Sequence, residues 1–484
     1  MATRSEKSAE AIVVASTGRR AEREGVSDAL SMRPVVPQMP APAGRVVTGL
    51  GEARCQAISD ETGLPRQGTE GAGRDLLMQV LARENLQRAW KRVKANKGAA
   101  GVDGLGIAET GEALKRTWPG IRQRLLAGMY RPRPVRRVAI PKSDGSKREL
   151  GIPTVTDRLI QQALLQVLQP LIDPTFSEHS YGFRPGRRAR GAVLAAQRYA
   201  QQGYRIVVDV DLSKFFDRVN HDILIDRLGK RVKDAGVIRL VRAYLNAGIM
   251  DSGVVIERHE GTPQGGPLSP LLANVLLDDV DRELERRGHR FARYADDCNV
   301  YVRSWKAGER VMALLRRCYA RLRLTVNESK SAVASVFGRR FLGYALWRTS
   351  QDEVRRGVSE KALHAFKHRV RQLTRRSGGR SIEQVVEKLR SYLLGWKGYY
   401  GLAQIPRVWR RLDEWIRRRL RTLHLKQWRR GKTAYRELLR LGASPSVAHS
   451  VAALSRRWWH NSRSALHNVL TIAYFDRLGV PRLS

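Results

Sequence analysis

The chain has 484 residues and a formal net charge of +43, from 89 lysines and arginines against 46 aspartates and glutamates. This charge indicates a polyanionic partner, with nucleic acid the leading candidate, and the length predicts roughly two to four domains. No apolar run approaches the roughly 20 residues that span a bilayer, which argues against a membrane protein. Three scattered cysteines are too few for a disulfide framework or a zinc site, which is typical of a reducing cytosol.

The N-terminal segment, residues 1–74, differs in composition from the rest of the chain. It is rich in Ala, Gly, Ser, Glu, Arg and Pro and poor in aromatic residues, which predicts a flexible extension. The apolar run at residues 11–15 is too short for the core of a signal peptide. From about residue 75, leucines and valines recur at helical spacing as far as Trp90, which predicts the start of folded structure.

Residues 136–148 predict a β-hairpin with its turn at Asp144 and Gly145. The basic residues of this hairpin suit a triphosphate, because arginine grips phosphate through two hydrogen bonds and lysine adds a point charge. An exposed charged hairpin without a ligand is the alternative interpretation. The interpretation as a triphosphate-binding hairpin depends on a catalytic centre elsewhere in the chain.

An apolar stretch, residues 204–212, predicts a β-strand that carries two aspartates. Because side chains alternate between the faces of a strand, Asp209 and Asp211 share one face, and either could be a metal ligand. The residues that follow the strand distinguish the two aspartates as candidates. Phe216 lies five positions after Asp211, whereas Lys214 lies five positions after Asp209.

Glycines and prolines are too dense at residues 261–270 for the interior of a strand or helix, which predicts a rigid loop. Pro267 and Pro270 suit the first turn of a helix that runs toward Glu285. Glycines would let the backbone of this loop approach a base pair closely.

Tyr294-Ala295-Asp296-Asp297 separates two short apolar stretches, which predicts a hairpin with two carboxylates at its tip. Adjacent carboxylates repel each other and are costly to desolvate, so they persist most readily where cations neutralise them. Ligands that are all oxygen favour Mg²⁺, and Mg²⁺ in a nucleic-acid enzyme suggests two-metal phosphoryl transfer. An ordinary turn is the alternative, since aspartate is common in turns.

Beyond about Gly357 the sequence predicts helices with apolar residues on one face and basic residues on the other. Residues 415–430 contain seven lysines and arginines and no acid. A positive field so concentrated would destabilise itself without an anion, which predicts an anion-binding surface. Six of the ten tryptophans fall between residues 391 and 460, and core packing is the favoured interpretation for them. The candidate nucleic-acid contacts on this surface are Arg417, Arg418, Arg421 and Lys426.

Taken together, these motifs resemble those of group II intron reverse transcriptases. The pattern Asp211-x-x-x-x-Phe216 and the Tyr-x-Asp-Asp turn resemble two palm motifs, and residues 261–270 resemble the motif between them. The resemblance continues in five further segments, namely residues 151–154, 181–187, 324–330, 341–344 and 389–400.

The resemblance implies an α+β, right-hand polymerase fold. Residues 75–350 would form the fingers and palm, with an antiparallel palm sheet and helices, and residues 357–484 an α-helical thumb or maturase (X) domain. The catalytic metal ligands would be Asp211, Asp296 and Asp297, with two Mg²⁺ ions, and Asp209 is the second choice for the first ligand. Phe216 would exclude the ribose 2′-OH by steric clash. The other residues assigned to the nucleotide are Lys142, Arg148, Arg136, Gln264 and Lys330.

The implied function is RNA-directed DNA synthesis from deoxynucleoside triphosphates, with RNA as template and DNA as primer or target. Members of the family also bind intron RNA, assist its splicing and take part in retrohoming, which places the protein in a bacterial cytoplasm. We expect no strand cleavage, because no Cys-x-x-Cys pair or His-Asn-His cluster follows the thumb. The alternatives are a maturase that needs no polymerase activity and a reverse transcriptase recruited to DNA repair or defence. A viral-type RNA polymerase is disfavoured by Phe216. The oligomeric state stays open.

Overall fold

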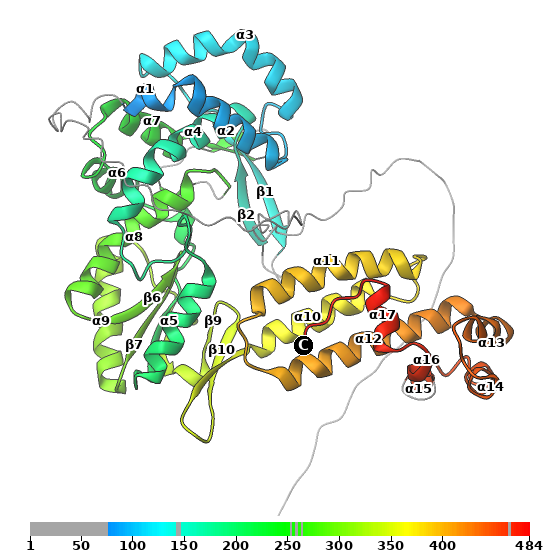
Figure 1. The fold of residues 1–484 in the computed structure, drawn as a ribbon. Helices are drawn as coiled ribbons and strands as arrows, with labels where there is room; N and C mark the ends of the chain where they lie inside the picture. Colours follow the sequence, from blue (N-terminus) through cyan, green and yellow to red (C-terminus); the bar gives the residue numbers. More distant parts are fainter. Residues whose placement is uncertain (1–75, 142–146, 252–253, 257–259, 263–264, 463–465) are drawn as a thin grey trace, which may run out of the picture. The chain divides into compact units, whose positions relative to one another are not determined.

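The computed structural model describes residues 76–141, 147–251, 254–256, 260–262, 265–462 and 466–484 (Figure 1). The N-terminal extension expected at residues 1–74 lies outside them. The described chain combines helices with three small sheets. None of its described helices has both the length and the apolar character needed to cross a membrane.

The described chain begins with four helices around one apolar core. They are α1 (Leu76–Val80), α2 (Arg83–Ala95), α3 (Ile107–Leu126) and α4 (Val155–Ile172). The expected helix near Trp90 is therefore present as α2. Its Ala89 is buried against α4, and the buried Asn85 amide donates to the carbonyl oxygen of Ala163 at 3.1 Å. This hydrogen bond fixes α2 on α4.

The first sheet contains the expected basic hairpin. Strands β1 (Val135–Pro141) and β2 (Lys147–Ile152) pair antiparallel, with Arg136 opposite Ile152. Strands β4 (Ile249–Asp251) and β5 (Val254–Ile256) extend it in the order β2-β1-β4-β5, and β1 runs parallel to β4. The expected turn at Asp144 and Gly145 lies outside the described residues.

The second sheet is antiparallel throughout and has the order β6-β7-β3-β8. Its strands are β3 (Ile206–Val210), β6 (Arg290–Tyr294), β7 (Asp297–Val302) and β8 (Ala332–Ser335). Val208 and Val210 pack in the core formed with α8 (Ser269–Arg286) and α9 (Trp305–Arg321), whereas Val207 packs against α5 (Ala189–Gln201). These helices cover the two faces of the sheet (Figure 1).

Two boundaries near this sheet refine the sequence-based expectations. The strand expected at residues 204–212 is shorter, because the backbone of Asp211 leaves the sheet and its carbonyl oxygen accepts the Asn327 N–H at 2.8 Å. The chain then forms a 3-10 turn, η2 (Phe215–Asp217), followed by α6 (His221–Gly229) and α7 (Ala235–Leu245). The helix expected after the glycine-rich loop is α8, with a proline in its first turn.

The third sheet leads into the C-terminal helices. It joins β9 (Arg340–Phe341), β10 (Tyr344–Arg348) and β11 (Val354–Val358) in the order β11-β10-β9. The elements that follow within the described residues are α-helices, as the sequence predicts. They are α10 (Glu360–Leu373), α11 (Ile382–Tyr400), α12 (Pro406–Trp428), α13 (Gly431–Arg440), α14 (Pro445–Ala453), α15 (Trp458–Asn461), α16 (Leu466–Val469) and α17 (Ile472–Arg477).

A separate apolar core joins α10, α11 and α12 through buried residues such as Phe366, Leu389 and Leu420. The tryptophans do not all belong to it. Trp396 is 9 % exposed and packs in this core, as the favoured interpretation predicts, whereas Trp459 is 45 % exposed.

Candidate functional site

Two strands bring the expected carboxylates together. Tyr294 pairs with Asp297 to close the β6–β7 hairpin, and Ala295, with a φ of 58°, and Asp296 form its turn. Strand β3 pairs with β7 so that Val210 lies opposite Cys298. Asp211 follows Val210, and Asp297 precedes Cys298 on an antiparallel strand, so these two aspartates leave the same end of the sheet side by side.

The electrostatic environment of Asp297 agrees with this convergence. The pKa of the Asp297 carboxyl is raised to about 7, mainly by burial and additionally by the negative charges of Asp296, Asp211 and Asp209. Like charges raise a carboxyl pKa in this way only when they are close. A cation placed among these oxygens would relieve the repulsion.

Asp209 and Asp211 occupy different surroundings. The Asp209 carboxylate forms an ion pair with the Arg339 guanidinium, with 2.8 Å between nitrogen and oxygen. The Lys330 ammonium lies 3.9 Å from the Asp211 carboxylate, and the Asp211 side chain is 36 % exposed. Since arginine already neutralises Asp209, Asp211 is the better candidate for a metal ligand, in agreement with the spacing to Phe216.

These aspartates line a cavity of about 850 Å³. Asp209, Asp211 and Asp297 lie on its wall with four basic residues, namely Lys330, Arg339, Arg340 and Lys361. A cavity of this size has room for a nucleotide. Its mixture of carboxylates and cations suits a ligand that carries both phosphate and bound metal.

The carboxylates suit Mg²⁺ as a partial ligand set. Among the described residues, no three His, Cys, Asp or Glu side chains are grouped closely enough to hold a metal ion on their own. Mg²⁺ in enzymes of phosphoryl transfer is usually held by one or two carboxylates, by water and by the substrate phosphates. Asp211 and Asp297 on neighbouring strands match that mode, in which the nucleotide completes the ligand set.

The expected steric gate lies directly after the first aspartate. Phe216, in η2, is 8 % exposed and packs edge-to-face on Phe215, with 5.0 Å between ring centroids. Its carbonyl oxygen accepts the Thr262 N–H at 2.7 Å, which attaches the start of the glycine-rich loop to this turn. Phe216 and the loop are therefore held together, although Gln264 lies outside the described residues.

The expected phosphate contacts of the hairpin are only partly described. Lys142 lies outside the described residues, and the side chain of Arg148 is not described. Arg136, on β1, is half-buried, and its Nε has no hydrogen-bond partner among the residues that the structure describes. A buried guanidinium nitrogen is usually paired, so this one could take an acceptor from outside the described part of the chain.

A buried arginine that the sequence analysis did not predict stabilises the turn that carries Asp296 and Asp297. Arg293 is fully buried on β6 and forms an ion pair with Asp281 at 2.6 Å. The Arg293 guanidinium also donates to the carbonyl oxygen of Ala295 and to Asn274 Oδ1, both at 2.9 Å. The only signal in the sequence is a charged residue inside an apolar strand, immediately before Tyr294.

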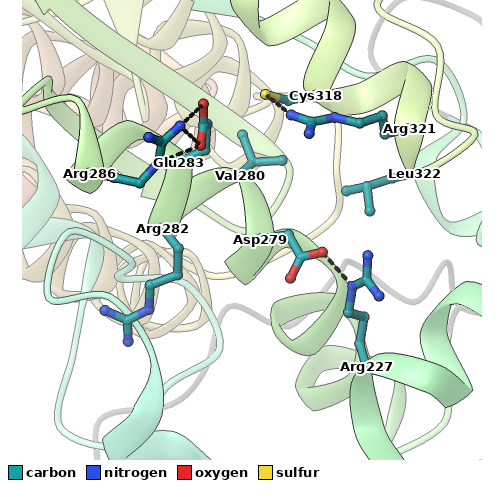
Figure 2. Close-up of a pocket in the computed structure, with 9 residues that line it drawn as sticks. All are labelled: Arg227, Asp279, Val280, Arg282, Glu283, Arg286, Cys318, Arg321 and Leu322. Atoms are coloured by element: carbon teal, nitrogen blue, oxygen red, sulfur yellow. Dashed lines mark hydrogen bonds and ion pairs between the residues drawn. The ribbon is translucent and has the colours of Figure 1, made fainter. Parts of the chain in front are cut away.

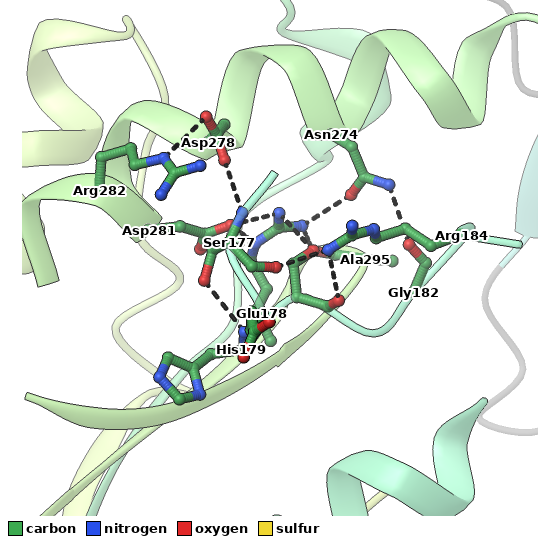
Figure 3. Close-up of polar contacts among 12 residues, drawn as sticks. Ser177, Glu178, His179, Gly182, Arg184, Asn274, Asp278, Asp281, Arg282 and Ala295 are labelled. Carbon is green, nitrogen blue, oxygen red and sulfur yellow. Dashed lines mark hydrogen bonds and ion pairs between the residues drawn. The ribbon is translucent and has the colours of Figure 1, made fainter. Parts of the chain in front are cut away.

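The loop at residues 177–187 closes the same network (Figure 3). The Asn274 amide donates to the carbonyl oxygen of Gly182 at 2.9 Å. A Cβ on Gly182 would lie 2.2 Å from the backbone nitrogen of Ala295, so the loop packs directly on the turn. Arg184 in turn donates to the carbonyl oxygen of Ser177 at 2.5 Å. This motif therefore supports the carboxylates rather than facing the cavity.

The four expected RNA contacts on α12 differ in their surroundings. Arg418 lies 5.3 Å from the ring centroid of Trp459, and Lys426 lies 5.0 Å from that of Trp458. Arg421 donates to the carbonyl oxygen of Leu470 at 2.9 Å, and burial lowers its pKa to about 10. Its guanidinium thus stabilises the C-terminal fold, whereas Arg417 is half-buried on the same helix.

A second cavity, of about 260 Å³, lies between α6, α8 and α9 (Figure 2). Two arginines on its wall pair with its own acidic residues, Arg227 with Asp279 and Arg286 with Glu283. Arg321 donates to the Cys318 sulfur at 3.3 Å. None of the three expected catalytic aspartates lines this cavity, so it is a separate feature.

Comparisons with known proteins match two regions of the chain. Residues 140–346 match the family model described as "Reverse transcriptase (RNA-dependent DNA polymerase)", and residues 363–442 match "Group II intron, maturase-specific domain". Protein YkfC of Escherichia coli K12 is 33 % identical over 317 residues, which cover 56 % of this chain and 83 % of YkfC.

Two intron-encoded proteins match over shorter regions. Group II intron-encoded protein LtrA of Lactococcus lactis subsp. cremoris is 36 % identical over 209 residues, or 42 % of this chain and 34 % of LtrA. The putative COX1/OXI3 intron 2 protein of Saccharomyces cerevisiae is 31 % identical over 207 residues, or 41 % of this chain and 23 % of that protein. The matched region is thus about a third of LtrA and less of the yeast protein.

Proposed function

Because this chain belongs to the group II intron reverse transcriptase and maturase family, with that family's RNA-directed DNA polymerase domain, we propose that Asp211, Asp296 and Asp297 form its polymerase site with two Mg²⁺ ions. The observation that carries the proposal is the pairing of β3 with β7, which sets Asp211 beside Asp297 at a cavity with basic walls. Asp296 lies on the turn between the strands.

The reaction would join a primer 3′-oxygen to the α-phosphorus of a deoxynucleoside triphosphate, with pyrophosphate leaving. Bound Mg²⁺ supplies positive charge that makes the 3′-hydroxyl more acidic and stabilises the leaving group. Asp211, Asp296 and Asp297 would hold that charge in place. Lys330 and Arg340, on the cavity wall, offset the negative charge of the triphosphate.

The remaining nucleotide contacts of the proposal are those that the family resemblance implies. Phe216 lies under the sugar and excludes the 2′-OH, so that deoxynucleotides are selected. Arg136 grips a phosphate with the guanidinium nitrogen that has no acceptor among the described residues. Lys142, Arg148 and Gln264 complete the nucleotide site from the hairpin and the glycine-rich loop.

Primer extension on an RNA template with Mg²⁺ and deoxynucleotides tests the site. We expect Asp211→Asn and Asp297→Asn to lower the rate by about 100-fold or more, because each removes charge that stabilises the transition state. Asp222→Asn, whose side chain is 77 % exposed on α6, is the matched control and should extend normally.

Asp209→Asn decides between the two aspartates of the first strand. We expect a smaller loss than for Asp211→Asn, since Asp209 is already paired with Arg339. Full activity of Asp211→Asn with loss in Asp209→Asn would assign the metal to Asp209 instead. Full activity in both would overturn the site.

We also propose that the helices matched by the maturase model bind intron RNA, assist its splicing and take part in retrohoming into DNA. Contacts to A-form RNA would be mostly to phosphates, because its deep groove hides the base edges. Arg417, Arg418 and Lys426 supply such contacts from α12. Arg421 contributes indirectly, by stabilising the fold that presents them.

The test uses a transcript of the intron that flanks the coding region, with splicing followed at low Mg²⁺ in the presence and absence of the protein. Arg418→Glu should slow splicing while primer extension on an unrelated template continues. The Asp297→Asn variant should support normal splicing of the intron but not its retrohoming. Splicing that is unaffected by the protein would favour the alternative of a reverse transcriptase with a role in DNA repair or defence.

A further inference from the structure

Trp459 is a large apolar side chain at the surface of a strongly basic region. It lies on α15, beyond the residues matched by the maturase model, and is 45 % exposed. The sequence contains no aspartate or glutamate between residues 438 and 475, and residues 415–436 are equally without acid. An exposed indole in such a field is suited to a ligand that is both flat and anionic.

Cations lie over the rings at this place. The Arg418 guanidinium is 5.3 Å from the ring centroid of Trp459. The neighbouring Trp458 has the Arg376 guanidinium at 4.9 Å and the Lys426 ammonium at 5.0 Å. These contacts draw on α12, on α15 and on the segment between α10 and α11, so the pairs of ring and cation are assembled by the fold.

The short helix that carries the tryptophans is firmly attached. The buried Asn461 amide donates to the carbonyl oxygens of Val451 and Leu454, at 3.1 and 2.8 Å. The Ser462 hydroxyl donates to the carbonyl oxygen of Trp459 at 2.8 Å. A ring on an anchored helix needs no ordering of the backbone when a ligand stacks on it.

We propose that Trp459 and Arg418 form a stacking site for an unpaired base of single-stranded nucleic acid, with Arg376 and Lys426 near the adjoining phosphates. The inference rests on the proposed RNA binding of this domain and adds a specific subsite to it. An exposed indole can stack on any base that is not already stacked in a duplex. A duplex offers this surface mainly its phosphates, so the tryptophan distinguishes single strands from double strands.

The experiment measures the binding of the full chain to a labelled 12-nucleotide single-stranded RNA, to DNA of the same sequence and to the corresponding RNA duplex. Magnesium and deoxynucleotides are left out, so binding is independent of the polymerase reaction. We expect Trp459→Ala to weaken single-strand binding by about 5- to 100-fold, the usual range for loss of one stacked base. Its affinity for the duplex should change less than twofold.

Three further variants make the result specific. Trp459→Phe should retain most of the affinity, because it keeps an aromatic face. Trp305→Ala removes a tryptophan that is 53 % exposed on α9 and should bind as the unaltered chain does. Lys426→Gln removes a proposed phosphate contact and should reduce the magnitude of the slope of log affinity against log salt by about 0.7, whereas Trp459→Ala should leave that slope unchanged.

A loss confined to RNA or to DNA would support the site and identify which strand it takes. Unchanged single-strand binding in Trp459→Ala would overturn the proposal, as would an equal loss for single strand and duplex. If Trp459→Ala lost binding to vesicles that contain anionic phosphatidylglycerol while its RNA affinity stayed unchanged, the surface would be assigned to membranes instead. If the chain binds the single strand through Trp459 but cannot extend a primer, the proposed polymerase site is overturned and the stacking site stands.

Discussion

The Arg293 guanidinium donates a 2.9 Å hydrogen bond to the carbonyl oxygen of Ala295, inside the turn that carries Asp296 and Asp297. Arg293 is itself held by Asp281 on α8, with both groups buried. The turn is therefore supported by a charge pair from the helix behind the sheet. This support keeps the backbone of the turn in place while its carboxylates repel one another.

Asp281→Asn should destabilise the fold by about 3 to 5 kcal/mol, because it leaves the Arg293 charge buried without its partner. Urea unfolding measures this loss. Asp279→Asn on the same helix is the matched control and should cost at most about 1 kcal/mol, since its ion pair with Arg227 is partly exposed. Equal stability of the two variants would show that the buried pair does not support the turn.

Gly182→Ala tests the contact between the 177–187 loop and the turn. The added Cβ would lie 2.2 Å from the Ala295 nitrogen, and backbone cannot move aside as a flexible side chain can. We expect a stability loss of about 1 to 3 kcal/mol, together with slower extension at saturating nucleotide. Gly120→Ala, on α3 with nothing within 4 Å, should stabilise the chain by up to about 1 kcal/mol. Normal extension by Gly182→Ala would exclude this positioning role.

The parts of the site that the sequence predicts are those set by local patterns. Two apolar runs around Tyr294 to Asp297 predict a hairpin, and the observed pairing of Tyr294 with Asp297 closes it as expected. The spacing to Phe216 favours Asp211 over Asp209, and the ion pair of Asp209 with Arg339 agrees. That these aspartates bind metal stays a prediction.

The support behind the turn could not be predicted, because it joins residues far apart in the chain. Asn274 reaches Gly182 across 92 positions, and Ser180 accepts from Arg293 across 113. Periodicity carries no information about such pairs. The predicted end of the strand at residue 212 was wrong for a similar reason. Asp211 leaves the sheet, and its carbonyl oxygen accepts a hydrogen bond from the N–H of Asn327, which lies far away in the sequence.

Phe216→Ala should admit ribonucleotides, because removal of the ring makes room for a 2′-OH. We expect the preference for deoxynucleotides in primer extension to fall on the order of tenfold or more. Phe215→Ala is the matched control, since Phe215 is also buried in η2 and either truncation should cost about 3 to 5 kcal/mol of stability. An equal gain of ribonucleotide use in both variants would attribute the effect to loosened packing and exclude a gate.

The stability of the C-terminal helices should fall as the pH is lowered, because His424 is buried in its neutral form. Burial lowers the pKa of His424 from 6.5 to about 4, although the nearby Glu383 carboxylate opposes this shift, and the ring lies 3.1 Å from the Tyr474 hydroxyl. The unfolded chain therefore binds a proton at higher pH than the folded chain does. The stabilisation is complete above about pH 6.5 and is lost progressively down to about pH 4, a total of about 3 kcal/mol.

Urea unfolding between pH 7.5 and pH 4.5 measures this loss, and His424→Gln should flatten the dependence because it removes the titrating group. His449→Gln, at an exposed position on α14, should leave the dependence unchanged. An unaltered pH dependence in His424→Gln would show that carboxylates elsewhere govern the acid sensitivity. A dependence that flattens only in His424→Gln would confirm that the helices around α12 fold with this imidazole uncharged.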